Sequence, residues 1–307
     1  CQCLFSHHEG NNIVIEPTII LLLSIMMRLI LPTDFSKNAW HAIKYAAFLF
    51  EQSPCSFIII YAHQVSPSGL ISTINKDRET RLHEITVKES ERKLNKIVNH
   101  LNKINKIPRH RFEGELVTDS LLNAIGREVI DKDADYIIMG TQGASGLSEI
   151  FMGSNTVSVI KNINFCPVIA VPNSYDFSSF EEILFATNFK HLYQRVELQP
   201  LLDLAELRKA RINVIHVIEE KELNEEQQQL KKLLRDLLGK DNIDFEDFEY
   251  HPNIALKISD LCEKKNAGMI SMINSQHGFF KGLTHEPVIK KVAFKTKIPF
   301  LVLPEIE

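Results

Sequence analysis

The sequence predicts an α/β protein in which two tandem copies of a five-stranded parallel-sheet domain follow each other. From Arg28 onward, short apolar runs alternate with amphipathic helical patterns, and such an order gives a parallel sheet with helices on both faces. The pattern then repeats at a spacing that suits tandem duplication. Three matches carry the repeat: 29–35 (LILPTDF) with 183–189 (ILFATNF), 59–65 (IIYAHQV) with 213–219 (NVIHVIE), and 166–172 (CPVIAVP) with 298–304 (IPFLVLP).

Each element of the first copy is predicted from its own residues. Residues 56–63 (SFIIIYAH) are apolar on both faces, as a central parallel strand must be. Ser36 is of the type that caps a helix, and apolar residues follow it at helical spacing. Strands are expected at 28–31, 56–63, 110–117, 136–140 and 167–172, and helices after Ser36, over 88–104, around Ile125 and from Ser154.

The composition is that of an ordinary globular protein. A chain of 307 residues, 44% hydrophobic and 24% charged, is long enough for two domains. The formal net charge of −4 gives no overall attraction for nucleic acid, so no such partner is expected. The lysines of residues 88–106 alternate with Leu94, Ile97 and Leu101 at helical spacing, which indicates a helix with a solvated polar face.

Residues 1–27 are expected to be an extension outside the fold. Residues 18–27 (TIILLLSIMM) are apolar but too short to span a bilayer, and no basic segment or cleavage site accompanies them. Met26 and Met27 indicate that the functional chain starts there, with an uncleaved membrane anchor as the alternative. No membrane partner is therefore expected.

The cysteines indicate a reducing compartment. There are five, an odd number with no CxxC pair, and those at 55, 166 and 262 lie among apolar residues. Buried free thiols in a cytoplasmic protein are the expected result.

A binding site is expected where two strand ends of the first copy meet. Residues 32–36 (PTDFS) follow the first strand, and a loop with four glycines, 140–153, follows the fourth. Ligands of parallel sheets bind beyond the carboxyl ends of the strands, so both segments should face one crevice. A helix that then begins with Ser154, Asn155 and Thr156 offers N–H groups and hydroxyls to an anion. The loop has no lysine, which excludes a Walker A loop, and its glycine spacing does not fit the dinucleotide fingerprint.

These motifs resemble those of the universal stress protein family. The loop fits the family's ATP-binding signature GxxGx9G(S/T) as Gly140, Gly143, Gly153 and Ser154, and the opening "ILPTDFS" and closing "CPVIAVP" are also typical of it. The resemblance covers the chain after residue 27, once per copy. It implies a Rossmann-like domain of the adenine nucleotide alpha-hydrolase-like type, and it implies bound ATP as the ligand.

The resemblance also implies which residues hold ATP, while general considerations leave alternatives. Asp34 could instead be a turn or capping aspartate, the glycines could form a plain connector, and His63, which recurs as His216, is best explained as a satisfied strand-end residue. Gln64 stands where an aliphatic residue is common. Mg²⁺ or Mn²⁺ would be held only through the phosphates. The implied contacts are Pro32, Thr33, Asp34 and Gln64 for adenosine, and Met139, Gly140, Gly143, Gly153, Ser154, Asn155 and Thr156 for ribose and phosphates.

The second copy departs from this pattern at the site positions. Asp34 becomes Asn188, and the position of Gly140 falls at Ile273 or Asn274. A carboxylate at the start of the following helix would take the place of a phosphate. We therefore predict that the second copy binds no ATP. The remaining replacements are Gly153 by His285, Ser154 by Glu286 and Thr156 by Val288.

The leading hypothesis for function is a cytoplasmic, ATP-binding regulatory module of the stress response, with one site per chain. Its expected domains are residues 28–172, which bind the nucleotide, and 180–307, joined by the linker 173–179. The resemblance implies that the last strands of the copies pair as an intrachain pseudo-dimer, and a homodimer is the other assembly. A slow ATP hydrolase or autokinase using Ser154 or Thr156 is one alternative, and an interaction scaffold without nucleotide is another.

Overall fold

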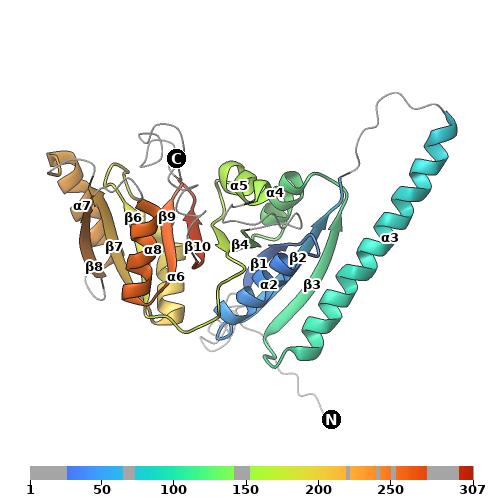
Figure 1. Cartoon of the computed structure of the whole chain (residues 1–307), viewed down its shortest axis with the longest axis horizontal. Helices are drawn as coiled ribbons and strands as arrows, with labels where there is room; N and C mark the ends of the chain where they lie inside the picture. Colours follow the sequence, from blue (N-terminus) through green and yellow to red (C-terminus); the bar gives the residue numbers. More distant parts are fainter. Residues whose placement is uncertain are drawn as a thin grey trace, which may run out of the picture.

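The computed structural model describes residues 26–64, 73–141, 153–218, 222–239, 243–249, 254–274 and 297–306. The predicted α/β fold class is confirmed (Figure 1). The elements of the first half are β1 (Met27–Pro32), α2 (Lys37–Leu49), β2 (Cys55–Ala62), α3 (Thr73–Ile104), β3 (His110–Val117), α4 (Leu121–Asp131), β4 (Tyr136–Gly140), α5 (Ser154–Asn162) and β5 (Val168–Val171).

The second half repeats this order of strands and helices from β6 to β9, and residues 275–296, between β9 and β10, lie outside the described residues. From β6 to β9 the strands are again separated by helices, as a parallel sheet requires. The elements are β6 (Glu182–Thr187), α6 (Arg195–Arg208), β7 (Arg211–Ile218), α7 (Glu225–Leu238), β8 (Ile243–Glu249), α8 (Ile254–Lys265), β9 (Ala267–Ile273) and β10 (Phe300–Leu303).

All ten strands belong to one sheet, with the order β3-β2-β1-β4-β5-β10-β9-β6-β7-β8. The strand pairs within each half are parallel, whereas β5 and β10 pair in antiparallel fashion, with Leu301 opposite Ile169. The two last strands, "VIAV" and "FLVL", therefore lie side by side at the centre, and Figure 1 shows the halves to either side of them. All carboxyl ends of the parallel strands within a half consequently lie at one edge of its sheet.

The core lies on both faces of the sheet because side chains alternate along each strand. Leu29 and Leu31 face the layer that contains α2, α3, α6 and α7, whereas Ile30 faces the layer of α4, α5 and α8. All three side chains are fully buried. Strands that are apolar on both faces thus explain the near-continuous apolar runs of the sequence.

The halves are also joined by buried polar contacts. Arg208 of α6 donates from Nη1 to the carbonyls of Phe48 (3.3 Å) and Leu49 (3.5 Å) at the end of α2. Its guanidinium lies 4.7 Å from the Phe48 ring centre. The Tyr136 hydroxyl of β4 donates to the Pro200 carbonyl at 2.8 Å. The second half is therefore packed directly against the helix that follows β1.

The linker between the halves packs against α2 rather than crossing the surface freely. Phe177 stacks on Phe48 with ring centres 5.6 Å apart, and Tyr175 meets Tyr45 edge-on at 5.7 Å. Phe180 is also buried. The aromatic residues within this otherwise polar segment thus extend the core between the halves.

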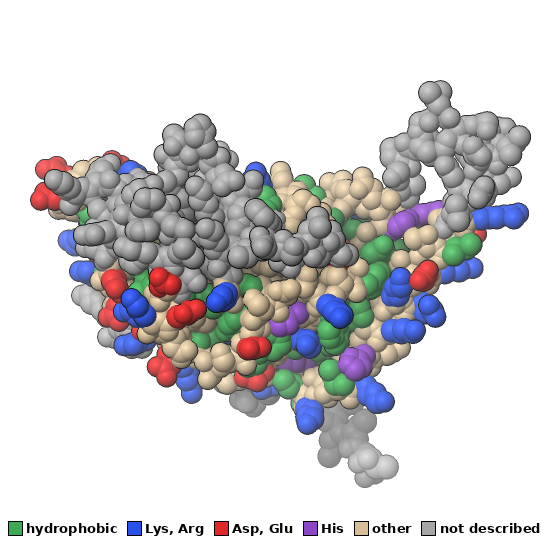
Figure 2. All heavy atoms as spheres, in the orientation of Figure 1, with side chains coloured by type: hydrophobic (Ala, Val, Ile, Leu, Met, Phe, Trp, Pro, Cys, Tyr) green, Lys and Arg blue, Asp and Glu red, His purple; other side chains and the backbone are tan. Residues whose placement is uncertain are grey.

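The helix α3 runs along the outer edge of the sheet, against β3 (Figure 1). Leu94 and Leu101 are buried, and the lysines predicted to lie on a polar face are exposed. Figure 2 shows basic side chains spread along this side of the molecule. Among the described residues, no helix combines the length and apolar character needed to cross a membrane.

The register of the sheet corrects one of the repeat matches. Leu31 pairs with Ile59, and its counterpart Phe185 pairs with Val214, so the match that aligned Ile59 with Asn213 is wrong by one residue. The residue in the place of His216 is consequently Tyr61, and His63 does not recur there. The error arises because a strand that is apolar on both faces gives no alternation to fix its phase.

Candidate functional site

A pocket lies at the carboxyl ends of β1, β2 and β4, beside the start of α5. Its volume is about 340 Å³. Of the described residues predicted to hold ATP, all except Gln64 line it: Pro32, Thr33, Asp34, Met139, Gly140, Gly153, Ser154, Asn155 and Thr156. The fold thus brings the turn after β1 and the start of α5 into one crevice, as expected for a parallel sheet.

The turn after β1 is held by its own side chains. The Thr33 hydroxyl accepts from the Phe35 N–H at 3.1 Å, and the Asp34 carboxylate accepts from the Ser36 N–H at 2.9 Å. Phe35 adopts a left-handed φ of 63°, and Ser36 caps α2 by accepting from the Ala39 N–H at 3.1 Å. Asp34 is therefore an exposed carboxylate that lines the pocket, and it is also a turn residue, as the alternative interpretation predicted.

Gly140 allows β4 to end tightly against the first turn of α2. A Cβ atom at this position would lie 3.0 Å from the Asn38 carbonyl oxygen, a backbone atom that can give way only if the helix moves. The Gly140 carbonyl also accepts from the Thr156 hydroxyl at 2.8 Å. Thr156, only 2% exposed, thus ties the start of α5 to the end of β4.

The start of α5 opens into the pocket without a side-chain cap. Its N-cap residue is Gly153, which has no side chain to satisfy the N–H groups of the first turn. Ser154 and Asn155 are exposed there, and both line the pocket. The partial positive charge of a helix N-terminus favours an anion at this position.

Some expected site residues are not part of this pocket, and others were missed. Gln64 is exposed and does not line it, and Gly143 lies outside the described residues. The side chains missed are Ala39, Tyr61, Ala62 and Leu121, which also line the pocket. Their signal was positional: Tyr61 and Ala62 end β2, and Leu121 begins α4, at the same edge of the sheet.

His63 contacts a second histidine, and this contact was not predicted from the sequence. Its Nε2 lies 3.1 Å from Nδ1 of His83 on α3, and both rings are half-buried. One neutral imidazole can donate to the other, so the contact agrees with a satisfied strand-end histidine. Within the described ranges, no group of three or more histidines, cysteines and acidic residues is arranged to hold a metal ion.

The described cysteines are buried thiols, as predicted. Burial raises the pKa of Cys55, Cys166 and Cys262 to about 12, and the nearby Asp135 carboxylate adds to the effect on the first two. Thiols with such a pKa stay protonated at neutral pH and are poor nucleophiles. We therefore assign these three residues to packing.

The corresponding edge of the second half has the same turn, but its Asn188 is buried rather than exposed. Thr187 and Asn188 accept from the N–H groups of Phe189 (3.0 Å) and Lys190 (3.1 Å), and Phe189 has a φ of 54°. Asn188 is only 5% exposed, however, and its carbonyl accepts from the Gln227 side chain at 3.1 Å.

The sheet register also settles which residue replaces Gly140. Ile30 pairs with Ile137 of β4, and its counterpart Leu184 pairs with Ile270 of β9, which places Ile273 at the position of Gly140. Ile273 is buried. The other predicted replacements, from His285 to Val288, lie outside the described residues.

Comparison with known proteins agrees with this fold. The sequence model of the Universal stress protein family matches residues 26–172. Universal stress protein MJ0577 of Methanocaldococcus jannaschii is 32% identical over 164 residues, which cover 48% of this chain and 97% of that protein. Its relative MJ0531, from the same organism, is 27% identical over 152 residues, covering 48% and 83%.

A solved structure extends the similarity to both halves. A universal stress protein from Archaeoglobus fulgidus superposes with a TM-score of 0.61 at 17% identity, over 91% of this chain and 96% of that one. At this identity the similarity concerns the fold alone. The sequence match covers nearly the whole of MJ0577 at 32% identity, and it therefore identifies the family. The chain belongs to the universal stress protein family.

Proposed function

We propose that the protein is an ATP-binding regulatory module of the stress response, with its nucleotide site in the first half. The observation that carries the proposal is the pocket that joins the turn after β1 to the uncapped start of α5. The proposed units are a nucleotide-binding domain, 28–172, a linker, 173–179, and a supporting domain, 180–307. We propose the cytoplasm as its location.

The residues of the pocket fit an adenine nucleotide in polarity and in charge distribution. The N–H groups of the first turn of α5, together with the hydroxyl of Ser154, would receive phosphate oxygens. Asp34 would accept from a hydroxyl or amino group of the nucleoside, and Tyr61 and Leu121 supply apolar surface at the same edge. Mg²⁺ or Mn²⁺ would be held through the phosphates.

ATP binding to the full chain, measured by isothermal titration calorimetry, tests the site. Gly153→Glu places a carboxylate at the N-cap, where it would compete with phosphate, and should lower the affinity by at least about tenfold. Gly153 has a φ of −57°, so the variant introduces no left-handed strain.

Ser158→Glu is the matched control for this variant. It adds the same charge to the same helix, at a half-exposed position that does not line the pocket, and should leave the affinity within about threefold. Equal affinities for the wild type and Gly153→Glu would reject the site.

The same preparation distinguishes the alternative functions. A slow hydrolase would transfer the γ-phosphoryl group of ATP to water and release phosphate faster than Gly153→Glu does. An autokinase would transfer the same group to the hydroxyl of Ser154 or Thr156 and release ADP. The Thr156 hydroxyl already donates to the Gly140 carbonyl, which makes Ser154 the better acceptor of the two. A scaffold without nucleotide would show no change in melting temperature with ATP.

A further inference from the structure

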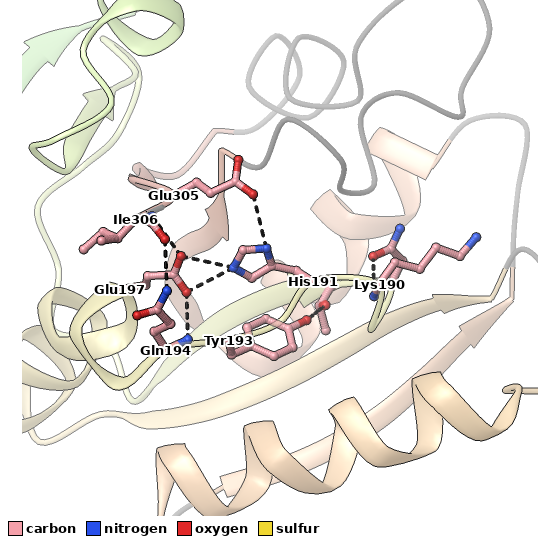
Figure 3. Close-up of polar contacts among 9 residues, drawn as sticks. Lys190, His191, Tyr193, Gln194, Glu197, Glu305 and Ile306 are labelled. Carbon is pink, nitrogen blue, oxygen red and sulfur yellow. Dashed lines mark hydrogen bonds and ion pairs between the residues drawn. The ribbon is translucent and has the colours of Figure 1, made fainter.

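The C-terminal tail, residues 304–306, folds back onto the loop between β6 and α6. Figure 3 shows the His191 imidazole between two carboxylates, Glu197 on α6 and Glu305 on the tail. Its Nε2 lies 3.0 Å from Glu197 Oε2, and its Nδ1 lies 3.5 Å from Glu305 Oε1. The side chains of His191, Glu197 and Glu305 are 12%, 0% and 18% exposed, so water does not separate the charges.

Both contacts can be favourable only when the imidazole carries a proton on each nitrogen. A neutral imidazole has one N–H and one lone pair, and an ionised carboxylate only accepts. In the neutral form, one of the two carboxylates would therefore face the lone pair of a ring nitrogen of His191. The arrangement is accordingly that of an imidazolium, whose charge is shared between α6 and the tail.

Glu197 connects this histidine to the backbone of the tail. Its Oε1 accepts from the Ile306 N–H at 3.0 Å, and its Oε2 accepts from the Gln194 N–H at 2.8 Å. The Gln194 side chain in turn donates to the Ile306 carbonyl at 3.0 Å (Figure 3). One buried carboxylate thus holds the first turn of α6, the preceding loop and the tail together.

Glu197 remains ionised while a histidine titrates. Burial alone raises the pKa of its carboxyl, but the hydrogen bonds from His191, Ile306 and Gln194 outweigh burial and bring the pKa below the ordinary value. Tyr193 also contacts His191, and its ring meets the imidazole edge-on at 5.2 Å. Burial raises the pKa of Tyr193, so this side chain stays neutral.

The location of these contacts gives them a consequence for the whole chain. The tail follows directly on β10, which is the strand that joins the halves by pairing with β5. In the first half, α2 is capped by the neutral hydroxyl of Ser36, and this cap does not involve a titratable side chain. A proton-dependent contact therefore lies next to the junction on the side of the second half only.

We propose that His191 is a proton-controlled latch for the C-terminal tail. With a proton on both ring nitrogens it fastens residues 304–306 to the first turn of α6, and loss of one proton releases the Glu305 contact and loosens the tail. The latch is therefore closed in acid, where both ring nitrogens carry a proton, and open in alkali, where one of them does not. The latch is independent of the nucleotide site.

Hydrogen exchange of the Ile306 amide in the full chain tests the proposal, because this N–H is itself bonded to Glu197. Its protection, corrected for intrinsic exchange and compared with that of Leu301 in β10, should fall by about tenfold between about pH 5.5 and about pH 8. His191→Gln keeps a polar side chain without a proton to lose, and it should give low protection that does not vary with pH.

Two further variants keep the test decisive. His100→Gln removes an exposed histidine on α3 and should retain the wild-type pH dependence. Glu305→Gln alters only the partly exposed carboxylate of the tail, and it too should abolish the pH dependence of the Ile306 protection. This variant therefore tests the proposal even if His191→Gln does not fold. Wild-type protection that is constant over this range, or a pH dependence that survives in both His191→Gln and Glu305→Gln, would overturn the proposal.

Discussion

The two halves build the same turn after their first strand, but they differ in what surrounds it. In the first half, Asp34 is exposed at a pocket, and α2 begins close after the turn, at Lys37. In the second half, Asn188 is covered by Gln227, and α6 begins only at Arg195, after a longer loop. The backbone motif therefore belongs to the fold, whereas access to it is decided by the neighbouring side chains.

The difference extends to the strand that would complete a second site. Gly140 allows β4 to lie close against α2, whereas the buried side chain of Ile273 stands at the matching place on β9. The longer loop of the second half accommodates Tyr193, whose hydroxyl bonds to that of Thr187. Covering a site with packed side chains stabilises the domain and removes the crevice.

The largest effect is expected from giving the first half the residue of the second. Gly140→Ile would force a Cβ to within 3.0 Å of the Asn38 carbonyl and fill the pocket, so ATP affinity should fall by about 1,000-fold, roughly 4 kcal/mol. Calorimetry measures this, with circular dichroism as the check on folding. Gly126→Ala, where the nearest atom would be the Ile163 Cδ1 at 3.5 Å, should bind normally. Binding within about tenfold of wild type would contradict the assignment of the pocket.

The reverse change should destabilise the second half without creating a site. Ile273→Ala leaves a cavity in a buried position and should lower the free energy of unfolding by about 3 kcal/mol, measured with urea. Ile130→Ala, at a side chain that is 69% exposed, should change it by less than about 0.5 kcal/mol. A cost below about 1 kcal/mol would mean that Ile273 is not packed as described.

The helix caps should make the halves differ in acid. The pKa of Glu197 is lowered, because burial raises it but the hydrogen bonds to the carboxylate outweigh burial. The ionised carboxylate therefore stabilises the fold above the ordinary glutamate pKa, and this stabilisation is lost as the pH falls through the lowered pKa. The backbone N–H of Gln194 donates to Glu197, so its protection against hydrogen exchange should fall on acidification. The backbone N–H of Ala39 donates to Ser36, and its protection should not fall.

Glu197→Gln checks this assignment and should cost about 2 kcal/mol at neutral pH. It should also abolish the acid dependence of the Gln194 amide. Ser36→Ala is the matched variant in the first half, where the loss of a neutral cap should cost about 1 kcal/mol at every pH. Equal acid dependence of the two amides would remove this distinction between the halves.

The smallest effect is expected at the contact between α5 and β4. Thr156→Val removes the hydroxyl that donates to the Gly140 carbonyl and should lower the free energy of unfolding by about 1 kcal/mol. Thr156→Ser retains the donor and should lose less than Thr156→Val. A larger loss in Thr156→Ser than in Thr156→Val would show that the methyl group, rather than the hydrogen bond, supports this contact.

Much of the fold could be predicted because strands and caps leave local signals. Residues 110–117 were predicted as a strand and form β3, and Ser36 caps its helix as expected. The first part of α3, from Thr73, was missed because it contains few apolar residues at helical spacing. The alignment of the β2 sequence with the β7 sequence was wrong by one residue because both strands are apolar on both faces.

The pocket was predicted less completely than the fold. The positions named by a motif, such as Asp34 and Gly153, lie in it, whereas Tyr61 and Leu121 belong to no motif and could be found only from the positions of their strand and helix. Gln64 was named from the family resemblance, but it is exposed and does not line the pocket. Which side chains converge depends on the register of the sheet, and this is a tertiary property.

The central claim is that one half binds nucleotide and the other does not. Native mass spectrometry of the wild-type chain with saturating ATP counts the nucleotides directly. A single ATP per chain is expected, and it should be retained in Ile273→Ala and lost in Gly140→Ile. Two ATP molecules per chain, or a single one that persists in Gly140→Ile, would contradict the claim.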